Sequence, residues 1–303
     1  MTALWQESDV CVMVSPAVLS HRRGISLLEV LISIGILSIG LASVLALLPA
    51  GGSQARKAMI EDRKSALGSA ALSECHTRGF LNPLYWNGAS APPVMIDPLG
   101  QAAGVAVSPA GMPVVGIAGV TSGVMAEQIF SGGDDLAVRI PEDDTLPPVV
   151  MAQNNARRLS EGAFSWLATI TPITTAGVTT PFNRLSVIEF YRRSFDPASG
   201  ETAKSFAAAF DGPSVVITNP GIEKDQVKLF FPTGGVVLAA TGSEHRWLRI
   251  LMAAPTYATD ELTVTAIDLS VNLELPAVNG TVIAYGGAVG VTEQIVRLEE
   301  ITP

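Results

Sequence analysis

The feature that most constrains this chain is an uninterrupted apolar run near the N-terminus. From Ile25 to Leu48, 24 residues contain one ionisable group, Glu29. An α-helix rises about 1.5 Å per residue, so a helix of this length spans a hydrocarbon core of roughly 30 Å. The sequence therefore predicts one membrane-spanning helix over residues 25–48, in contact with lipid.

Two common kinds of N-terminal segment account for this run only in part. A secretory signal peptide would explain the basic residues His21-Arg22-Arg23-Gly24, but its apolar core is typically about 7–15 residues long. No small-x-small cleavage pattern follows the run, because Leu48 and Pro49 precede Ala50. A plain single-pass anchor explains the length but leaves Glu29 without a role. A third kind of segment explains both.

The junction residues Gly24-Ile25-Ser26-Leu27-Leu28-Glu29-Val30 resemble the cleavage motif of type IV prepilins. That motif has a glycine, a bulky apolar residue, Ser or Thr, two apolar residues and a glutamate. Basic residues precede it and a long apolar helix follows. The resemblance covers residues 22–48. It implies that a prepilin peptidase cuts between Gly24 and Ile25 on the cytoplasmic side, and that the new terminus at Ile25 is N-methylated. The family usually has Phe where this chain has Ile25.

Glu29 calls for a partner on physical grounds alone. A carboxylate within an apolar helix costs a few kcal/mol, and such a residue is a functional hypothesis by default. Cutting after Gly24 would create an amine at Ile25, one helical turn away. That amine could pair with Glu29 of its own chain, or with Glu29 of a neighbour in a filament. The alternative is that Glu29 lies near the lipid headgroups and extends to them. We assign Glu29 to assembly.

Charge counting does not fix the orientation of this helix. Basic residues lie on both sides of the span, namely Arg22, Arg23, Arg56, Lys57, Arg63 and Lys64. The positive-inside rule alone would therefore not place the N-terminus in the cytoplasm. The resemblance implies an inner-membrane protein with a cytoplasmic N-terminus and an extracytoplasmic head, which later enters a pilus or pseudopilus.

Residues 49–78 are predicted to be the soluble half of the same helix. Pro49 and Gly51-Gly52 mark the point where it leaves the membrane, and a helical pattern follows. Four residues can share the face that packs on the head: Ala55, Met59, Ala66 and Ala70. Near the helix end, Cys75 and His76 are too few for a metal site, so we assign them packing or surface roles.

The remaining residues divide at about residue 158. Residues 79–158 contain 19 Gly or Pro in 80 positions, which predicts loops with short strands and a helix only near residues 125–130. Residues 159–303 are rich in strand patterns. They are predicted at residues 164–171, 185–193, 214–218, 227–231, 247–252, 262–273 and 281–285, with 292–298 closing an edge. Turns are expected at Asp196-Pro197, Asn219-Pro220-Gly221, Gly234-Gly235 and Asn279-Gly280. The spacing predicts antiparallel sheet.

The cysteines and acidic residues indicate no cofactor or metal. Cys11 would leave with the 1–24 leader, so a processed chain would keep one thiol and form no internal disulfide. Two acidic groups lie in predicted loops, the pair Asp134-Asp135 and the triplet Glu142-Asp143-Asp144. Calcium binding by these loops is conceivable, but their spacing fits no EF-hand. Solvated loops are the preferred interpretation.

Composition and motifs argue against two broad function classes. The net charge is −9 with no dense basic stripe, which disfavours nucleic-acid binding. No nucleophile elbow, phosphate loop, dinucleotide fingerprint or Cys-x-x-Cys pair is present. His245 could form a hydrogen bond at a strand start, and Glu189 is expected to face solvent. A paired-carboxylate hydrolase stays open, because spatial pairing is invisible in a sequence.

The sequence thus predicts an α+β protein in which a long N-terminal membrane-spanning helix packs on an antiparallel β-sheet head. The expected function is that of a structural subunit, a minor pilin or pseudopilin of a type IV pilus or type II secretion pseudopilus. Its large head favours a minor subunit. Implied partners are the prepilin peptidase, other pilin or pseudopilin subunits, an inner-membrane assembly platform and lipid. The alternative is a membrane-anchored extracytoplasmic binding or adhesion protein.

Overall fold

The computed structural model describes most of the chain after Ile25. The described residues are 26–132, 136–139, 157–160, 163–175, 178–196, 202–212, 214–218, 221–222, 224–242, 244–256, 261–268 and 275–299. The chain divides into two compact units, Met1–Arg56 and Lys57–Pro303. We call the second unit the head.

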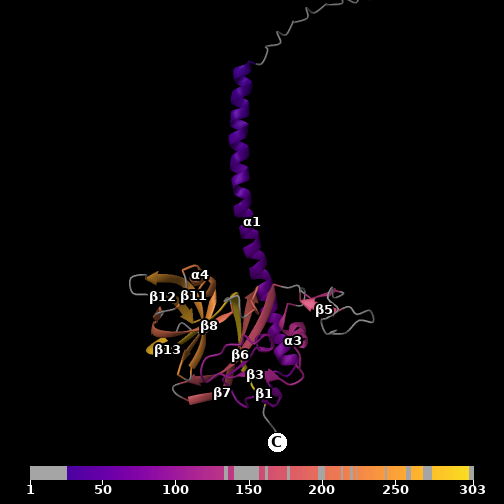
Figure 1. Ribbon diagram of the computed structural model, residues 1–303, viewed down its shortest axis with the longest axis vertical. Coiled ribbons are helices and arrows are strands. Elements are labelled where there is room, and N and C mark those ends of the chain that lie inside the picture. The colour runs from indigo at the N-terminus through magenta and orange to yellow at the C-terminus, as the bar shows by residue number, and fades with distance from the viewer. Residues whose placement is uncertain are drawn as a thin grey trace, which may run out of the picture. The chain divides into compact units, whose positions relative to one another are not determined.

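One helix, α1 (Leu27–Thr77), runs for 51 residues through the apolar run and beyond it (Figure 1). It continues across Pro49 and Gly51-Gly52, so the predicted membrane-spanning segment and the segment that follows it belong to a single helix. The predicted combination of a long N-terminal helix with β-sheet is therefore confirmed.

The face that α1 buries in the head differs from the predicted one. The buried or half-buried positions are Ile60, Lys64, Leu67, Gly68, Ala71, Leu72, Glu74 and Cys75, which recur at the three- and four-residue spacing of one helix face. Met59, Ala66 and Ala70, which were expected to pack on the head, are exposed. The prediction was wrong because it followed the alanines, whereas the buried stripe follows the larger apolar residues and admits a lysine.

Gly68 allows close approach of α1 to the sheet. A Cβ atom at this position would lie 2.2 Å from Thr292 Oγ1 and 2.4 Å from Glu189 Oε1. We expect Gly68→Val to lower the free energy of unfolding by about 2–3 kcal/mol, because overpacking forces the helix off the sheet. Chemical denaturation of the head would measure this. Ala70→Val, on the exposed face of the same helix, should change stability by less than about 1 kcal/mol, and an equal loss in both variants would contradict the close-packing explanation.

Residues 79–132 contain short elements, as predicted, and these build part of the core. They are a 3-10 turn (Pro83–Tyr85), β1 (Trp86–Asn87), β2 (Val94–Ile96), α2 (Pro98–Ala103), β3 (Val114–Ile117) and α3 (Gly123–Phe130). The helix expected near residues 125–130 is confirmed as α3, whereas α2 was not predicted. Asp97 caps α2 through its side chain, which accepts a hydrogen bond from Gly100 N at 3.0 Å.

The first sheet of the head has six strands in the order β1-β3-β2-β6-β7-β14. The long strands are β6 (Phe164–Thr175), β7 (Val178–Tyr191) and β14 (Ala288–Arg297). β2 and β3 pair in parallel and the other neighbours are antiparallel. β14 lies at one edge of the sheet, as the run at residues 292–298 predicted.

The second sheet closes into a six-stranded antiparallel barrel, which was not predicted. Its strands follow the order β10-β11-β12-β9-β8-β13, and β13 pairs with β10 to complete the ring. Their bounds are β8 (Ala203–Gly212), β9 (Ser214–Thr218), β10 (Val236–Thr241), β11 (Glu244–Thr256), β12 (Glu261–Asp268) and β13 (Leu275–Tyr285). A separate hairpin pairs β4 (Leu136–Arg139) with β5 (Arg157–Ser160).

Two local predictions in the barrel were wrong. Residues 227–231, predicted as a strand, lie in and directly after helix α4 (Lys224–Phe230). Val227, Phe230 and Phe231 have helical spacing, and all three are buried in the barrel core. Asn279-Gly280, expected to be a turn, lies within β13. A Cβ atom on Gly280 would lie 2.2 Å from the carbonyl oxygen of Ala240, so glycine here permits the close approach of β10.

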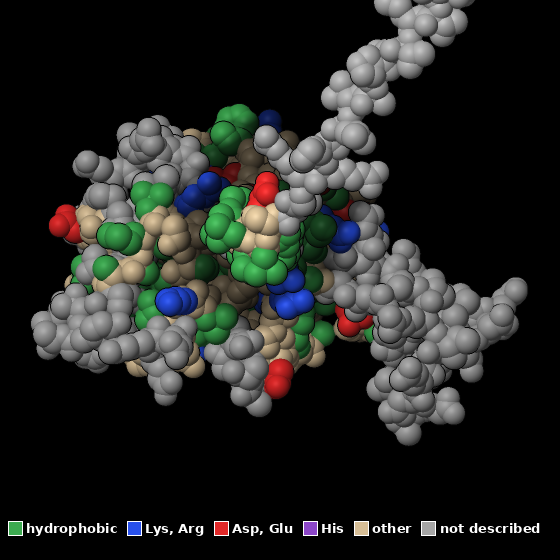
Figure 2. Space-filling model, turned by 90° about the horizontal axis from the view of Figure 1, so that it is seen from above, with side chains coloured by type: hydrophobic (Ala, Val, Ile, Leu, Met, Phe, Trp, Pro, Cys, Tyr) green, Lys and Arg blue, Asp and Glu red, His purple; other side chains and the backbone are tan. Residues whose placement is uncertain are grey.

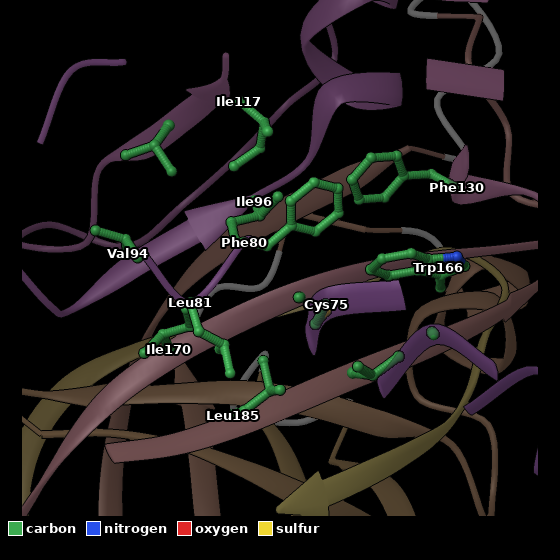
Figure 3. Packing of buried hydrophobic residues seen from close by; sticks show 14 of the residues in the cluster. Cys75, Phe80, Leu81, Val94, Ile96, Ile117, Phe130, Trp166, Ile170 and Leu185 are labelled. Atoms are coloured by element: carbon green, nitrogen blue, oxygen red, sulfur yellow. The ribbon is translucent and has the colours of Figure 1, made fainter. Parts of the chain in front are cut away.

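The β6–β7 region is covered on both faces. Trp166, Leu185 and Val187 belong to a core shared with α1 and the 79–132 elements. Ile188 and Phe190 belong to a second core shared with Leu238, Trp247 and Tyr285 of the barrel. Figure 3 shows the first core, where the rings of Phe80, Phe130 and Trp166 lie near Cys75.

We expect residues 53–303 to be soluble and to fold under reducing conditions without the span. Cys75 is a buried, free cysteine, and the described residues form three apolar clusters that require no cross-link. Circular dichroism should give the same cooperative thermal transition with and without reductant. A fragment that folds only after oxidation, or only with a metal, would contradict this prediction.

Candidate functional site

The described chain begins at the first turn of α1, where Ser26 precedes the helix. The side-chain hydroxyl of Ser26 accepts a hydrogen bond from the backbone N–H of Glu29 at 3.2 Å. This satisfies one of the amides that a helix start leaves unpaired. The Ser26-x-x-Glu29 spacing is that of a capping box. The residue pattern of the motif therefore also specifies where the helix begins.

Glu29 is favoured at this position by the helix itself. It lies in the first turn of α1, where the partial positive charge of the helix dipole stabilises an anion. Within the described residues, no hydrogen bond or ion pair reaches the Glu29 carboxylate. It therefore has capacity for a cationic partner that the single described chain does not supply.

The surroundings of Glu29 are apolar and exposed. Leu27–Leu45 has a mean hydropathy of 2.2, none of it is buried, and by length and composition it can cross a membrane. Figure 2, seen from above, shows hydrophobic side chains gathered near the centre of the described surface. A surface of this kind is stable in lipid or against other apolar helices.

The polar side chains farther along the span are satisfied within the helix. The hydroxyls of Ser33, Ser38 and Ser43 donate hydrogen bonds to carbonyls four residues earlier, at 2.8, 2.7 and 2.9 Å. Such bonds let serine enter a lipid environment without an unpaired donor. Among the polar side chains from Leu27 to Leu45, Glu29 is thus the one with no hydrogen-bond or ion-pair partner, backbone or side chain, within the described residues.

Two of the three predicted site residues, Gly24 and Ile25, lie outside the described residues. The same is true of Cys11 and of the acidic groups Asp134-Asp135 and Glu142-Asp143-Asp144. Glu29 is therefore the only predicted site residue whose geometry can be compared with expectation, and it lies in the apolar helix as predicted.

Cys75, His76 and His245 have structural environments in the head. Burial, with the charge of Glu74 adding to it, raises the pKa of the Cys75 thiol to about 12, so this thiol is neutral and unreactive. His76 Nε2 lies 3.3 Å from Gln294 Oε1. His245, at the start of β11, has Nε2 3.3 Å from the carbonyl oxygen of Ala110. No cluster of three metal-ligating side chains occurs among the described residues.

Glu189 is the residue that sequence reasoning placed wrongly. It was expected to face solvent, but it is 1% exposed. Burial raises its pKa to about 7, against the lowering effects of the Thr292 hydrogen bond and the charge of Lys64. A usable signal was present, since Val187, Ile188 and Phe190 are apolar on both faces of the strand, and such strands are covered on both sides.

A buried ion pair joins Asp97, which precedes α2, to Arg193, which follows β7. Arg193 donates two hydrogen bonds to Asp97, at 2.8 and 2.6 Å, and its guanidinium lies between the rings of Phe190 and Phe195. It borders a hollow of about 730 Å³ between α2, α3 and the adjoining ends of β6 and β7. Among its described lining residues the hollow has one exposed cation, Arg192.

A family model matches residues 19–45, and its description is the prokaryotic N-terminal methylation motif. The match covers the basic flank, the junction at residues 24–25, Glu29 and most of the apolar run. No curated protein and no solved structure matches the chain. The family match bears on the N-terminal segment alone.

Proposed function

We propose that this chain, which carries the N-terminal methylation motif that is the signature of type IV prepilins, is a minor pilin or pseudopilin. In this proposal a prepilin peptidase removes residues 1–24 and the amine of Ile25 is methylated. The apolar part of α1 then holds the subunit in the inner membrane until a filament takes it up. The match at residues 19–45 is the observation that carries the proposal.

The chemistry of the first helical turn supports the assembly step. The Glu29 carboxylate lies in an apolar, exposed helix with no side-chain partner among the described residues. Cleavage would place an amine at nearly the same depth. In a filament, the amine of one subunit could pair with Glu29 of the next. An ion pair in low dielectric depends strongly on distance, so it would favour one stagger of neighbouring helices over others.

The two-layered head supports a minor role in the filament. Most of the chain, Lys57–Pro303, belongs to the head unit, which contains a closed barrel in addition to the sheet that packs on α1. A second candidate function is that of a membrane-anchored protein whose head binds an extracytoplasmic ligand. The hollow of about 730 Å³ beside Arg192 favours it, because clefts of this size accommodate small ligands.

N-terminal sequencing after co-expression with a prepilin peptidase tests the proposal. A pilin-like subunit should have a methylated Ile25 as its first residue, and only when the peptidase is present. A membrane-anchored binding protein should keep its N-terminus intact, and a secreted protein should begin near Gly51. Either of the last two results would contradict the proposed function.

A further inference from the structure

The side chain of Glu189 lies at the contact between α1 and the first sheet. Side chains alternate along a strand, so Glu189 shares a face with Leu185 and Val187 of β7, which pack in the core that includes α1. Ile188 and Phe190 face the barrel. A single carboxyl group is therefore enclosed beside the apolar residues Leu185 and Val187, and it is 1% exposed.

Two glycines fit the backbone closely around this carboxyl group. A Cβ atom on Gly68 of α1 would lie 2.4 Å from Glu189 Oε1, and one on Gly290 of β14 would lie 2.6 Å from Oε2. Thr292 Oγ1 donates a hydrogen bond to Oε1 at 2.6 Å. Oε1 thus lies against both α1 and β14, Oε2 lies against β14, and the carboxyl group fills the space between helix and sheet.

The charges around Glu189 only partly compensate an anion there. On α1, Lys64 lies one turn before Gly68; its ammonium pairs with Glu61 and approaches the carbonyl of Val289 at 3.5 Å. Within the described residues it forms no ion pair with Glu189. Arg249 of β11 acts at longer range. The strand neighbours of Glu189 are uncharged, namely Trp166 on β6 and Gly290 on β14.

We propose that Glu189 is a proton-binding site that makes the docking of residues 57–77 of α1 on the head depend on pH. The neutral carboxyl group is a hydrogen-bonded part of the core. The anion is a buried charge that undocking of the helix would hydrate. This pH-dependent docking concerns the head alone and does not rest on the filament function.

The direction of the effect follows from the two states of Glu189. Burial raises its pKa from 4.5 to about 7 in the docked head, whereas in the undocked chain it returns to its ordinary value. The docked state therefore binds the proton more tightly. Its extra stability is fully present below about pH 4.5 and is lost as the pH rises through 7. This difference corresponds to an opening equilibrium on the order of 100-fold more favourable at pH 8.5 than at pH 4.5.

Cys75 provides a direct measurement of undocking. It is 0% exposed on the docked face of α1, and in a full-length chain carrying Cys11→Ser it is the only thiol. The purified protein in detergent micelles would be treated with 4,4′-dithiodipyridine between pH 4.5 and 8.5. Dividing each rate by that of Glu189→Gln at the same pH cancels the pH dependence of the thiol itself. We expect this ratio to be near 1 at pH 4.5 and to rise on the order of 100-fold by pH 8.5.

Two further variants keep the test decisive. Lys64→Met removes the nearest cation, which would raise the pKa of Glu189 further. Its rate divided by the parent's at the same pH needs no Glu189→Gln protein, and this quotient should increase from pH 7 to 8.5. Glu293→Gln makes the same chemical change on β14, where the carboxylate instead accepts a hydrogen bond from Ser186, and should keep the parent's profile. A flat ratio from pH 4.5 to 8.5, or a profile that Lys64→Met leaves unmoved, would overturn the proposal.

Discussion

Replacing Gly24 with valine is expected to block removal of residues 1–24 almost completely. A peptidase must bring its catalytic groups against the backbone at the scissile bond, and glycine, which has no Cβ, permits the closest approach. A branched side chain at Gly24 would hold the carbonyl away from the enzyme. The residues of the span would be unchanged, so the uncut precursor should still reach the membrane.

Intact-mass spectrometry of membranes from cells that also make a prepilin peptidase would measure this effect. The parent should be found as a chain beginning at Ile25, and Gly24→Val as the full-length precursor. Gly40→Val is the matched control, because a Cβ atom at Gly40 meets nothing within 4 Å, and it should be cut like the parent. Normal cutting of Gly24→Val, or a new terminus near Gly51 in the parent, would contradict the assignment of the cleavage site.

The N-terminal helix was predictable because its determinants are local. The length of the apolar run, the Ser26 cap and the position of Glu29 are all set by residues within a few turns of one another. The strands that pair with sequence neighbours were predictable for the same reason, as β6 and β7 illustrate.

The closed barrel was not predictable from local pattern. It depends on β13 pairing with both β8 and β10. The residue pattern within one strand does not show which distant strands pair with it. The misassigned α4 has the same origin. Its apolar residues suit a strand or a helix equally well, and their burial inside the barrel favours the helix.

Glu189 shows how an error in the predicted packing of α1 on the sheet affected the search for functional residues. Alternation along β7 correctly separated Glu189 from Ile188 and Phe190. The face of β7 opposite Ile188 and Phe190 was then expected to be exposed to solvent, whereas α1 covers it. The same prediction that placed α1 on the sheet named Ala66 and Ala70 as its packing face, although the contact is made at Lys64, Gly68 and Ala71. A titratable group at that contact could be recognised only once the helix face was known.

Replacing Glu29 with valine is expected to leave insertion and cleavage intact but to remove the subunit from filaments. A neutral apolar residue is better tolerated in a span than a carboxylate, so membrane levels should equal or exceed those of the parent. The methylated amine of Ile25 in the neighbouring subunit would then be buried without its partner. Truncating one member of a buried charge pair costs about 2 kcal/mol or more, which lowers incorporation roughly 30-fold or more.

Filaments sheared from cells that make equal membrane amounts of each variant would measure incorporation. Glu29→Gln separates charge from shape and should fail like valine, because it keeps the side-chain length but carries no charge with which to form an ion pair with the amine. Ser33→Ala is the control one turn away. It removes a hydroxyl that bonds the Glu29 carbonyl within the helix at 2.8 Å, and it should assemble like the parent. Equal incorporation of Glu29→Val and the parent would show that the carboxylate extends to the headgroups, and the cleavage motif would then be the remaining support for assembly.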